Sequence, residues 1–186
     1  APVGLERQVV RPVRAGAEQA WDIVIHQSVP AMGFDLRDHF VVRRRDLTPI
    51  TFDSRKDGVE HVRLTYASGR VTGWKTGTSG RETIDVALAG PTWDGNLWGP
   101  TFAALPMGRG RSFTLPFYHH DQGQGSFTLT VVGEEQAGGE QAWTVDAGTR
   151  PDRRSTYVLA KTDGRTLAVR AGPFITTRGG DCAALG

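Results

Sequence analysis

The stretch FVVRRRDLTPITFDSRKDGVEHVRLTYASGRVTGWK, residues 40–75, decides the fold class of this chain. Apolar and polar residues alternate along it in short runs, and the sequences Asp57-Gly58 and Ser68-Gly69 separate two of these runs. Alternation with a period of two predicts half-buried strands, and Asp-Gly or Ser-Gly between strands predicts tight hairpins. We therefore predict an antiparallel meander over this stretch.

The register of the hairpin around Gly58 depends on which side chains must share a face. A two-residue loop, Asp57-Gly58, would place Phe52 opposite Arg63 and divide the apolar side chains between both faces. A three-residue loop, residues 56–58, places Phe52 opposite Val62 and puts glycine at the last loop position, where φ is positive. We predict the three-residue loop. The apolar face of the meander would then carry Phe52, Val62, Leu64 and Tyr66.

Two other hairpins follow the same logic. A two-residue loop at Ser68-Gly69 keeps Tyr66 on the apolar face opposite Val71, and it sets Arg63 opposite Trp74 as a cation–π pair. Near the C-terminus, a loop of residues 162–164 ends in glycine. That loop sets Leu159 opposite Leu167 and Tyr157 opposite Val169, so that both pairs share a face.

The rest of the chain continues the pattern of short strands and turns. We count about ten or eleven strands at spacings of roughly 8–12 residues, which is typical of an antiparallel barrel, half-barrel or sandwich. The only helix-like piece is residues 101–105. We predict an all-β protein with a single domain over residues 1–186, and flexible tails at residues 1–4 and 178–186.

Composition narrows the class of partner. The 186 residues carry a net charge of only +2, and just three of the 22 basic residues are lysines, so we expect no nucleic-acid partner. No apolar run is long enough to span a bilayer. The single cysteine, Cys182, cannot form an internal disulfide. The chain begins Ala1-Pro2, as it would after removal of a signal peptide, which predicts a periplasmic or secreted protein; an engineered N-terminus would look the same.

Residues 90–111, GPTWDGNLWGPTFAALPMGRGR, interrupt the strand pattern. Long aromatic loops in compact domains are often functional, and apolar cavities are the usual sites for small molecules. Two interpretations stay open: an aromatic plug that closes one end of a barrel, or a lid over a bound ligand. Candidate ligand-binding residues are Trp93, Trp98, Phe102, Phe117, Tyr118 and Tyr66, together with His119 and His120.

The sequence His119-His120-Asp121 is the strongest candidate for chemistry. Neighbouring residues of a strand point to opposite faces, so the two histidines cannot bind one metal unless a turn brings them together. We expect a polar strand end here, no metal and no cofactor. His26 falls on the polar side of its strand, and the acidic pair Glu134-Glu135 lies in a Gly-rich loop, so we expect both to be solvated.

Three segments resemble a family of exported bacterial proteins of unknown function. They are residues 45–49 (RDLTP), residues 104–108 (ALPMG, with Met107 where leucine is expected), and a hairpin from Tyr157 to Leu167. The resemblance covers the chain from about residue 36 onward. It implies a β half-barrel similar in style to lipocalins and lipoprotein carriers, and it supplies no catalytic residues.

Three hypotheses for function follow. In the first, a non-enzymatic exported β domain binds an apolar or amphipathic small molecule; Trp93, Trp98 and Phe102 form the lid, and the apolar face of the meander forms the wall. In the second, a hydrolase or isomerase works through His119 or His120 and a nearby acid. In the third, an envelope structural or assembly module uses the arginine-rich face of the meander on a protein partner.

Overall fold

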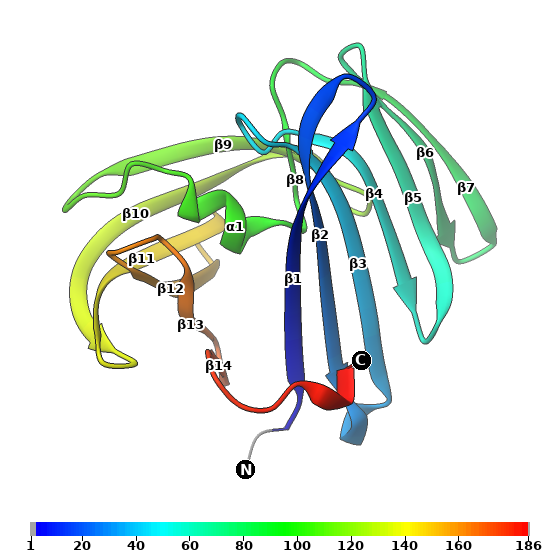
Figure 1. The fold of residues 1–186 in the computed structure, drawn as a ribbon. Coiled ribbons are helices and arrows are strands. Elements are labelled where there is room, and N and C mark those ends of the chain that lie inside the picture. Colours follow the sequence, from blue (N-terminus) through cyan, green and yellow to red (C-terminus); the bar gives the residue numbers. More distant parts are fainter. Residues whose placement is uncertain (1–2, 186) are drawn as a thin grey trace. The chain divides into compact units, whose positions relative to one another are not determined.

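A computed structural model describes residues 3–185 as an all-β protein, with 66% of residues in strands. The strands form two seven-stranded sheets, and neither sheet closes into a barrel over the described residues (Figure 1). The chain divides into two compact units. Unit 1 runs up to Thr92 and includes the residues from Asp181 onward, and unit 2 runs from Trp93 to Gly180. The described residues contain no helix that is both long and apolar enough to cross a membrane.

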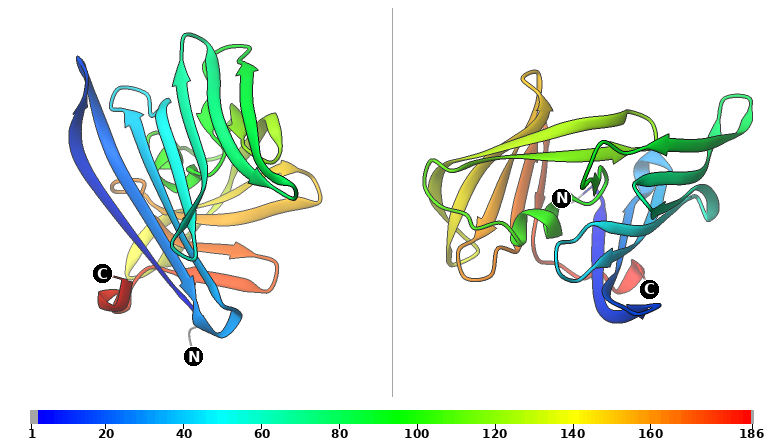
Figure 2. Two further views of the ribbon diagram at one scale, coloured as in Figure 1. Left: turned by 90° about the vertical axis from the view of Figure 1, so that its right-hand side faces the viewer. Right: turned by 90° about the horizontal axis from the view of Figure 1, so that it is seen from above.

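Unit 1 is an uninterrupted antiparallel meander in which each strand pairs with the next along the chain (Figure 2). Its strands are β1 Leu5–Ala15, β2 Glu18–Val29, β3 Phe34–Arg43, β4 Pro49–Lys56, β5 Val59–Ala67, β6 Arg70–Gly77 and β7 Gly80–Ala87. Two short 3-10 helices belong to this unit, η1 Pro30–Met32 and η2 Ala183–Leu185.

Unit 2 is a second meander, in which one short strand pairs in parallel at the edge of the sheet. Its strands are β8 Trp93–Asp94, β9 Ser112–His119, β10 Gly123–Ala137, β11 Glu140–Arg150, β12 Arg153–Ala160, β13 Thr166–Ala171 and β14 Phe174–Thr177. The single α-helix, α1, spans Trp98–Ala103 and lies within residues 90–111. It begins and ends slightly before the helix-like piece predicted at residues 101–105.

The hairpin β4–β5 has the predicted apolar face but not the predicted loop. Lys56 pairs with Val59 across the two-residue loop Asp57-Gly58, in which both residues have positive φ. The register then shifts between Ser54 and Arg55, so Phe52 pairs with Leu64 rather than with Val62. The three-residue loop was therefore wrong. The extra residue that keeps the apolar side chains together is a β-bulge inside β5.

The next hairpin, β5–β6, is as predicted: Ala67 pairs with Arg70 across Ser68-Gly69, and Arg63 stands opposite Trp74. The cation over the Trp74 ring, however, is Arg81, whose Cζ lies 3.8 Å from the ring centroid. Arg63 turns instead to Glu60, with Nη2 2.6 Å from its carboxylate. The cation–π pair was therefore assigned to the wrong arginine.

The hairpin β12–β13 also contains a bulge. Tyr157 pairs with Val169 as predicted, but Leu159 pairs with Thr166, and Leu167 is left without an opposite residue. Leu167 joins a small cluster with Val158 and Ala168, while Leu159 packs on the other face of the sheet. The predicted pairing of Leu159 with Leu167 was therefore wrong.

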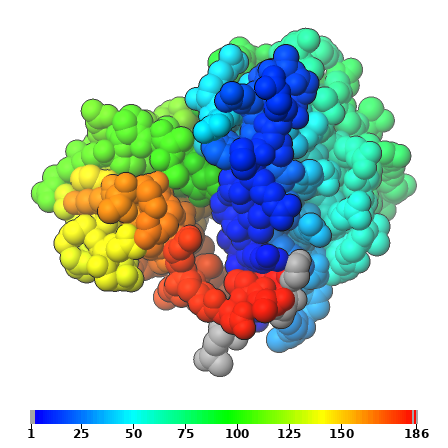
Figure 3. All heavy atoms as spheres, viewed as in Figure 1, coloured from blue at the N-terminus to red at the C-terminus, as the bar shows by residue number. Residues whose placement is uncertain are grey.

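The apolar face of unit 1 is deeply buried. Phe40 and Phe52 pair across β3 and β4, with ring centroids 4.9 Å apart, and both are at most 1% exposed. Of the tails expected to be flexible, residues 1, 2 and 186 lie outside the described residues. At the other end, η2 contacts β1 and β2, and Leu185 is 6% exposed. The space-filling view shows these C-terminal residues against the N-terminal strand (Figure 3).

Candidate functional site

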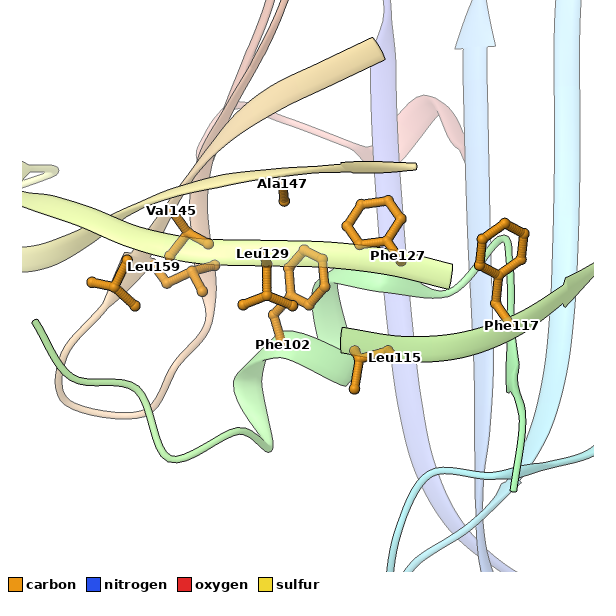
Figure 4. Close-up of a cluster of buried hydrophobic side chains, with 9 residues drawn as sticks. Phe102, Leu115, Phe117, Phe127, Leu129, Val145, Ala147 and Leu159 are labelled. Atoms are coloured by element: carbon orange, nitrogen blue, oxygen red, sulfur yellow. The ribbon is translucent and has the colours of Figure 1, made fainter. Parts of the chain in front are cut away.

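The aromatic segment of residues 90–111 lies against the apolar face of the unit 2 sheet. Trp98 stacks on Phe127 of β10 with ring centroids 4.0 Å apart, and it meets Phe117 of β9 edge-on at 5.5 Å. Phe102 contacts Phe127 at 5.5 Å and Tyr157 of β12 edge-on at 4.9 Å. Phe102 is 0% exposed and points from α1 toward the strands (Figure 4). Side chains thus fill the space between α1 and the sheet.

The helix α1 has little stability of its own. It is six residues long, and Leu97 at its N-cap makes no side-chain capping bond. Helices this short are not stable in isolation. At its C-terminal end it approaches the β12–β13 hairpin so closely that a Cβ on Gly164 would lie 2.8 Å from the Ala103 Cα. The packing of Trp98 and Phe102 therefore holds α1 in place.

The structure brings together only part of the predicted ligand-binding set. Trp93 pairs with Phe117 and packs against the same apolar cluster as Trp98 and Phe102. Tyr118 is 3% exposed, and as the neighbour of Phe117 in β9 it points to the opposite face of the sheet. Tyr66 belongs to the buried face of unit 1.

The two histidines and Asp121 meet where β9 ends. β9 stops at His119, and the turn that follows brings His120 to the same side. The two imidazole rings stack with centroids 4.4 Å apart and planes 19° apart. His119 Nδ1 accepts the backbone N–H of Asp121 at 3.1 Å, and His120 Nε2 lies 3.3 Å from Asp121 Oδ2.

This geometry suits mutual packing better than joint metal binding. The ligand atoms of the three residues lie within 4.8 Å of one another, which would admit a shared ion by distance alone. An imidazole nitrogen binds a metal through a lone pair that lies in the ring plane. Two nearly parallel, stacked rings direct these lone pairs side by side rather than toward one point. We therefore assign no ion to this turn.

Sequence reasoning missed a polar cluster in unit 1, in which the buried Ser54 contacts the half-buried Asp38 and His61. Ser54 is 1% exposed, and its Oγ donates to Asp38 Oδ1 at 2.5 Å. His61 Nε2 lies 2.9 Å from the same Oγ, and because the serine proton already points to Asp38, the histidine is the donor. In a hydrolase, histidine would instead accept the serine proton. The cluster therefore satisfies a buried hydroxyl and is not arranged for nucleophilic catalysis.

His39 forms a second charged cluster on the other face of unit 1. Its Nδ1 lies 2.9 Å from Asp53 Oδ2, and its Nε2 lies 3.3 Å from Asp22 Oδ2. The hydrogen bond to Asp53 raises the pKa of His39 above its usual value, and Asp22 adds to this effect against partial burial. Both contacts require a ring proton, so they favour the imidazolium form. Only the register across β2, β3 and β4 shows the partners of His39.

The fold and these sites define an all-β protein of two meander sheets, one of which carries a short aromatic helix on its apolar face. The chain belongs to the family described as "Protein of unknown function (DUF3108)", whose model matches residues 2–174. The match includes residues 2–35, which the sequence resemblance did not reach. Comparison with curated proteins and with solved structures found no match.

Proposed function

We propose that this protein binds an apolar or amphipathic small molecule with an alkyl chain on the apolar face of the unit 2 sheet, in the space that α1 fills. The observation that carries the proposal is how this face is covered. A six-residue helix with no side-chain cap lies on it, and two aromatic rings hold that helix there. An alkyl chain offers the sheet the same kind of surface, so it can replace the rings of Trp98 and Phe102.

The ring contacts set a minimum length for the ligand. Four aromatic pairs join α1 to the sheet, two from Trp98 and two from Phe102. At roughly 0.5–1.5 kcal/mol per pair, displacing α1 costs about 2–6 kcal/mol. Burying one methylene gains about 0.8 kcal/mol, so about three to eight methylenes offset this cost. Exposing the displaced rings raises the threshold further. We therefore expect long-chain fatty acids to bind and short-chain ones not to bind.

A tryptophan fluorescence titration with fatty acids of increasing chain length tests the proposal. Wild-type fluorescence should change with long chains only, and a Trp98→Phe variant should lose that signal while it keeps a ring at the same place. Trp21 in unit 1 provides the matched control, because a Trp21→Phe variant should respond as the wild type does. Binding that is independent of chain length, or no binding anywhere in the series, contradicts the proposal.

Export to the periplasm or beyond is a part of this proposal that rests on the sequence resemblance to exported proteins and lipocalin-style carriers. A soluble carrier for alkyl-chain molecules is useful where such molecules must cross an aqueous compartment. Fractionation of cells that express the full-length gene product tests it, since a purely cytoplasmic signal would refute export while leaving ligand binding to the titration.

A further inference from the structure

A row of basic side chains crosses the outer face of unit 1, opposite the face that carries Phe40 and Phe52. The strand register pairs Arg7 of β1 with His26 of β2, His26 with Arg37 of β3, and Arg37 with Arg55 of β4. Directly opposed residues share a face, with Cβ atoms about 4.5–5.5 Å apart, and like charges in such positions destabilise a sheet. A negatively charged group beside the row would therefore offset this repulsion.

Carboxylates of this chain neutralise only part of the row. Asp35 Oδ2 lies 3.0 Å from His26 Nε2. Arg7 Nη1 donates to the carbonyl oxygen of Leu185 at 3.5 Å, a long and uncharged contact. Within residues 3–185, Arg37 has no hydrogen-bond or ion-pair partner. Two guanidinium groups on either side of His26 are thus left with unneutralised charge.

Partners inside the chain lie at both ring nitrogens of His26. Its Nδ1 lies 3.3 Å from the carbonyl oxygen of Leu185, and its Nε2 faces Asp35. Both ring nitrogens of His26 are therefore engaged inside the chain. Direct donors to a ligand must come from the arginines.

A hollow of about 210 Å³ lies at this row. The residues around it are Arg7, Val9, Arg11, Asp22, Val24, His26, Arg37 and Leu185. At about 30 Å³ per water molecule, this volume corresponds to about seven waters, which is small for a drug-sized ligand but ample for a small polyatomic anion. The one carboxylate of the lining, Asp22, faces the imidazole of His39 at 3.3 Å. We call this hollow the arginine pocket.

We propose that the arginine pocket binds a phosphate-sized oxyanion, with Arg7 and Arg37 as its principal donors and Arg11 at its rim. Guanidinium groups present paired N–H donors that match phosphate oxygens two at a time. The apolar neighbours Val9, Val24 and Leu185 lower the local dielectric, which strengthens the attraction between the charges. The proposal is independent of alkyl-chain binding in unit 2, because the residues belong to unit 1.

The test measures binding of inorganic phosphate by calorimetry, in a phosphate-free buffer with ionic strength matched by chloride. An Arg7→Gln/Arg37→Gln double variant should bind phosphate about ten-fold more weakly or worse, since hydrogen bonds to charged groups are the strong ones. Arg153→Gln removes one positive charge from the exposed surface of unit 2 and should leave binding unchanged. An Arg7→Lys/Arg37→Lys variant keeps the charges but lacks the paired N–H donors of the guanidinium groups, and we expect it to bind phosphate with intermediate affinity.

A second arm separates free phosphate from a lipid headgroup. Phosphatidylcholine vesicles with and without phosphatidic acid present a phosphomonoester on a membrane surface. Binding of free phosphate supports a soluble ligand, and binding of the phosphatidic acid vesicles alone supports a headgroup. Binding of neither overturns the proposal, as does a double glutamine variant that binds like the wild type. If circular dichroism shows that the double glutamine variant does not fold, the double lysine variant provides the test. Unaltered phosphate binding by the double lysine variant overturns recognition by the paired guanidinium donors.

The ligand-free protein gives an independent readout. Because Arg37 stands between two basic neighbours, Arg37→Gln should raise the melting temperature in phosphate-free buffer and abolish the stabilisation that phosphate gives the wild type. A structural role for Arg37 would have the opposite effect on the first measurement. A lower melting temperature for the variant in phosphate-free buffer therefore contradicts the proposal.

Discussion

The helix α1 should open as a local unit, and the variant Trp98→Ala offers a quantitative test. The Trp98 ring makes two contacts with the sheet, at 4.0 Å to Phe127 and 5.5 Å to Phe117. At roughly 0.5–1.5 kcal/mol per aromatic pair, their loss lowers the free energy of opening α1 by about 1–3 kcal/mol. Since each 1.4 kcal/mol is a factor of about ten, the amides of residues 97–105 should exchange about 5–150 times faster.

Native-state hydrogen exchange followed by mass spectrometry at increasing urea provides the measurement. Urea promotes an opening in proportion to the surface that the opening exposes. Local opening of α1 exposes little, so exchange of residues 97–105 should be nearly independent of low urea concentrations, in both the wild type and the variant. Exchange of the buried strand β10 should depend on urea steeply, because it requires global unfolding. Trp74→Ala, in unit 1, removes an equal ring and should leave α1 exchange unchanged.

Two outcomes would refute this reasoning. If residues 97–105 show the same urea dependence as β10, the helix leaves the sheet only when the whole protein unfolds. If Trp98→Ala leaves the exchange of α1 unchanged, the two ring contacts do not hold it. In either case a ligand cannot take the place of α1 at the cost derived above, and the proposed binding mode fails with it.

Three further predictions concern the sheet of unit 1. Deleting His61, the bulge residue that faces no single residue of β4, should preserve the cooperative melting transition, whereas deleting Arg63 should abolish it by turning the following apolar side chains to the wrong face. Gly73→Ala should lower the free energy of unfolding in urea by at least about 2 kcal/mol, because φ is +146° and a Cβ would lie 2.0 Å from the Arg63 carbonyl oxygen. Folding raises the pKa of His39 above 6.5, so the stabilisation by its charged form is complete below that pH and is lost as pH rises through the raised pKa. The difference in melting temperature between wild type and His39→Gln should therefore shrink from about pH 5 to pH 9.

Alternation predicted an antiparallel meander and its buried face. It counted ten or eleven strands where the described residues form fourteen, and it placed Glu134 and Glu135 in a loop although both lie in β10. The β5–β6 hairpin was predicted residue for residue, since the Ser68-Gly69 turn and the apolar pattern permit only one register. The hairpin β4–β5 was shifted by two residues beyond its bulge, and β12–β13 by one residue on the loop side of its bulge. A pattern of buried side chains shows only which alternate residues of a strand share a face. Either a longer loop or a bulge keeps the apolar residues of both strands on the same face. The alternation pattern therefore could not predict the bulges at His61 and Leu167.

The same limit applies to the candidate sites. The aromatic segment around Trp98 was evident from composition, but its partner Phe127 lies on a distant strand. The arginine pocket depends on the pairing of three strands, and neither Arg7 nor Arg37 is remarkable within its own strand. Local signals thus located the residues whose neighbours are close in sequence. They could not locate sites that long-range register assembles.

The bulge in β5 also has a chemical cause, besides keeping the apolar side chains on one face. With a three-residue loop, His61 would stand opposite Asp53 and point away from the buried face. Ser54, which is 1% exposed, would then keep Asp38 and lose its second hydrogen-bond partner. The bulge turns His61 onto the side of Ser54, where its Nε2 lies 2.9 Å from the hydroxyl. Because an incompletely satisfied polar group in an apolar layer costs about 1–3 kcal/mol, the buried serine favours the two-residue turn with a bulge over the regular alternative.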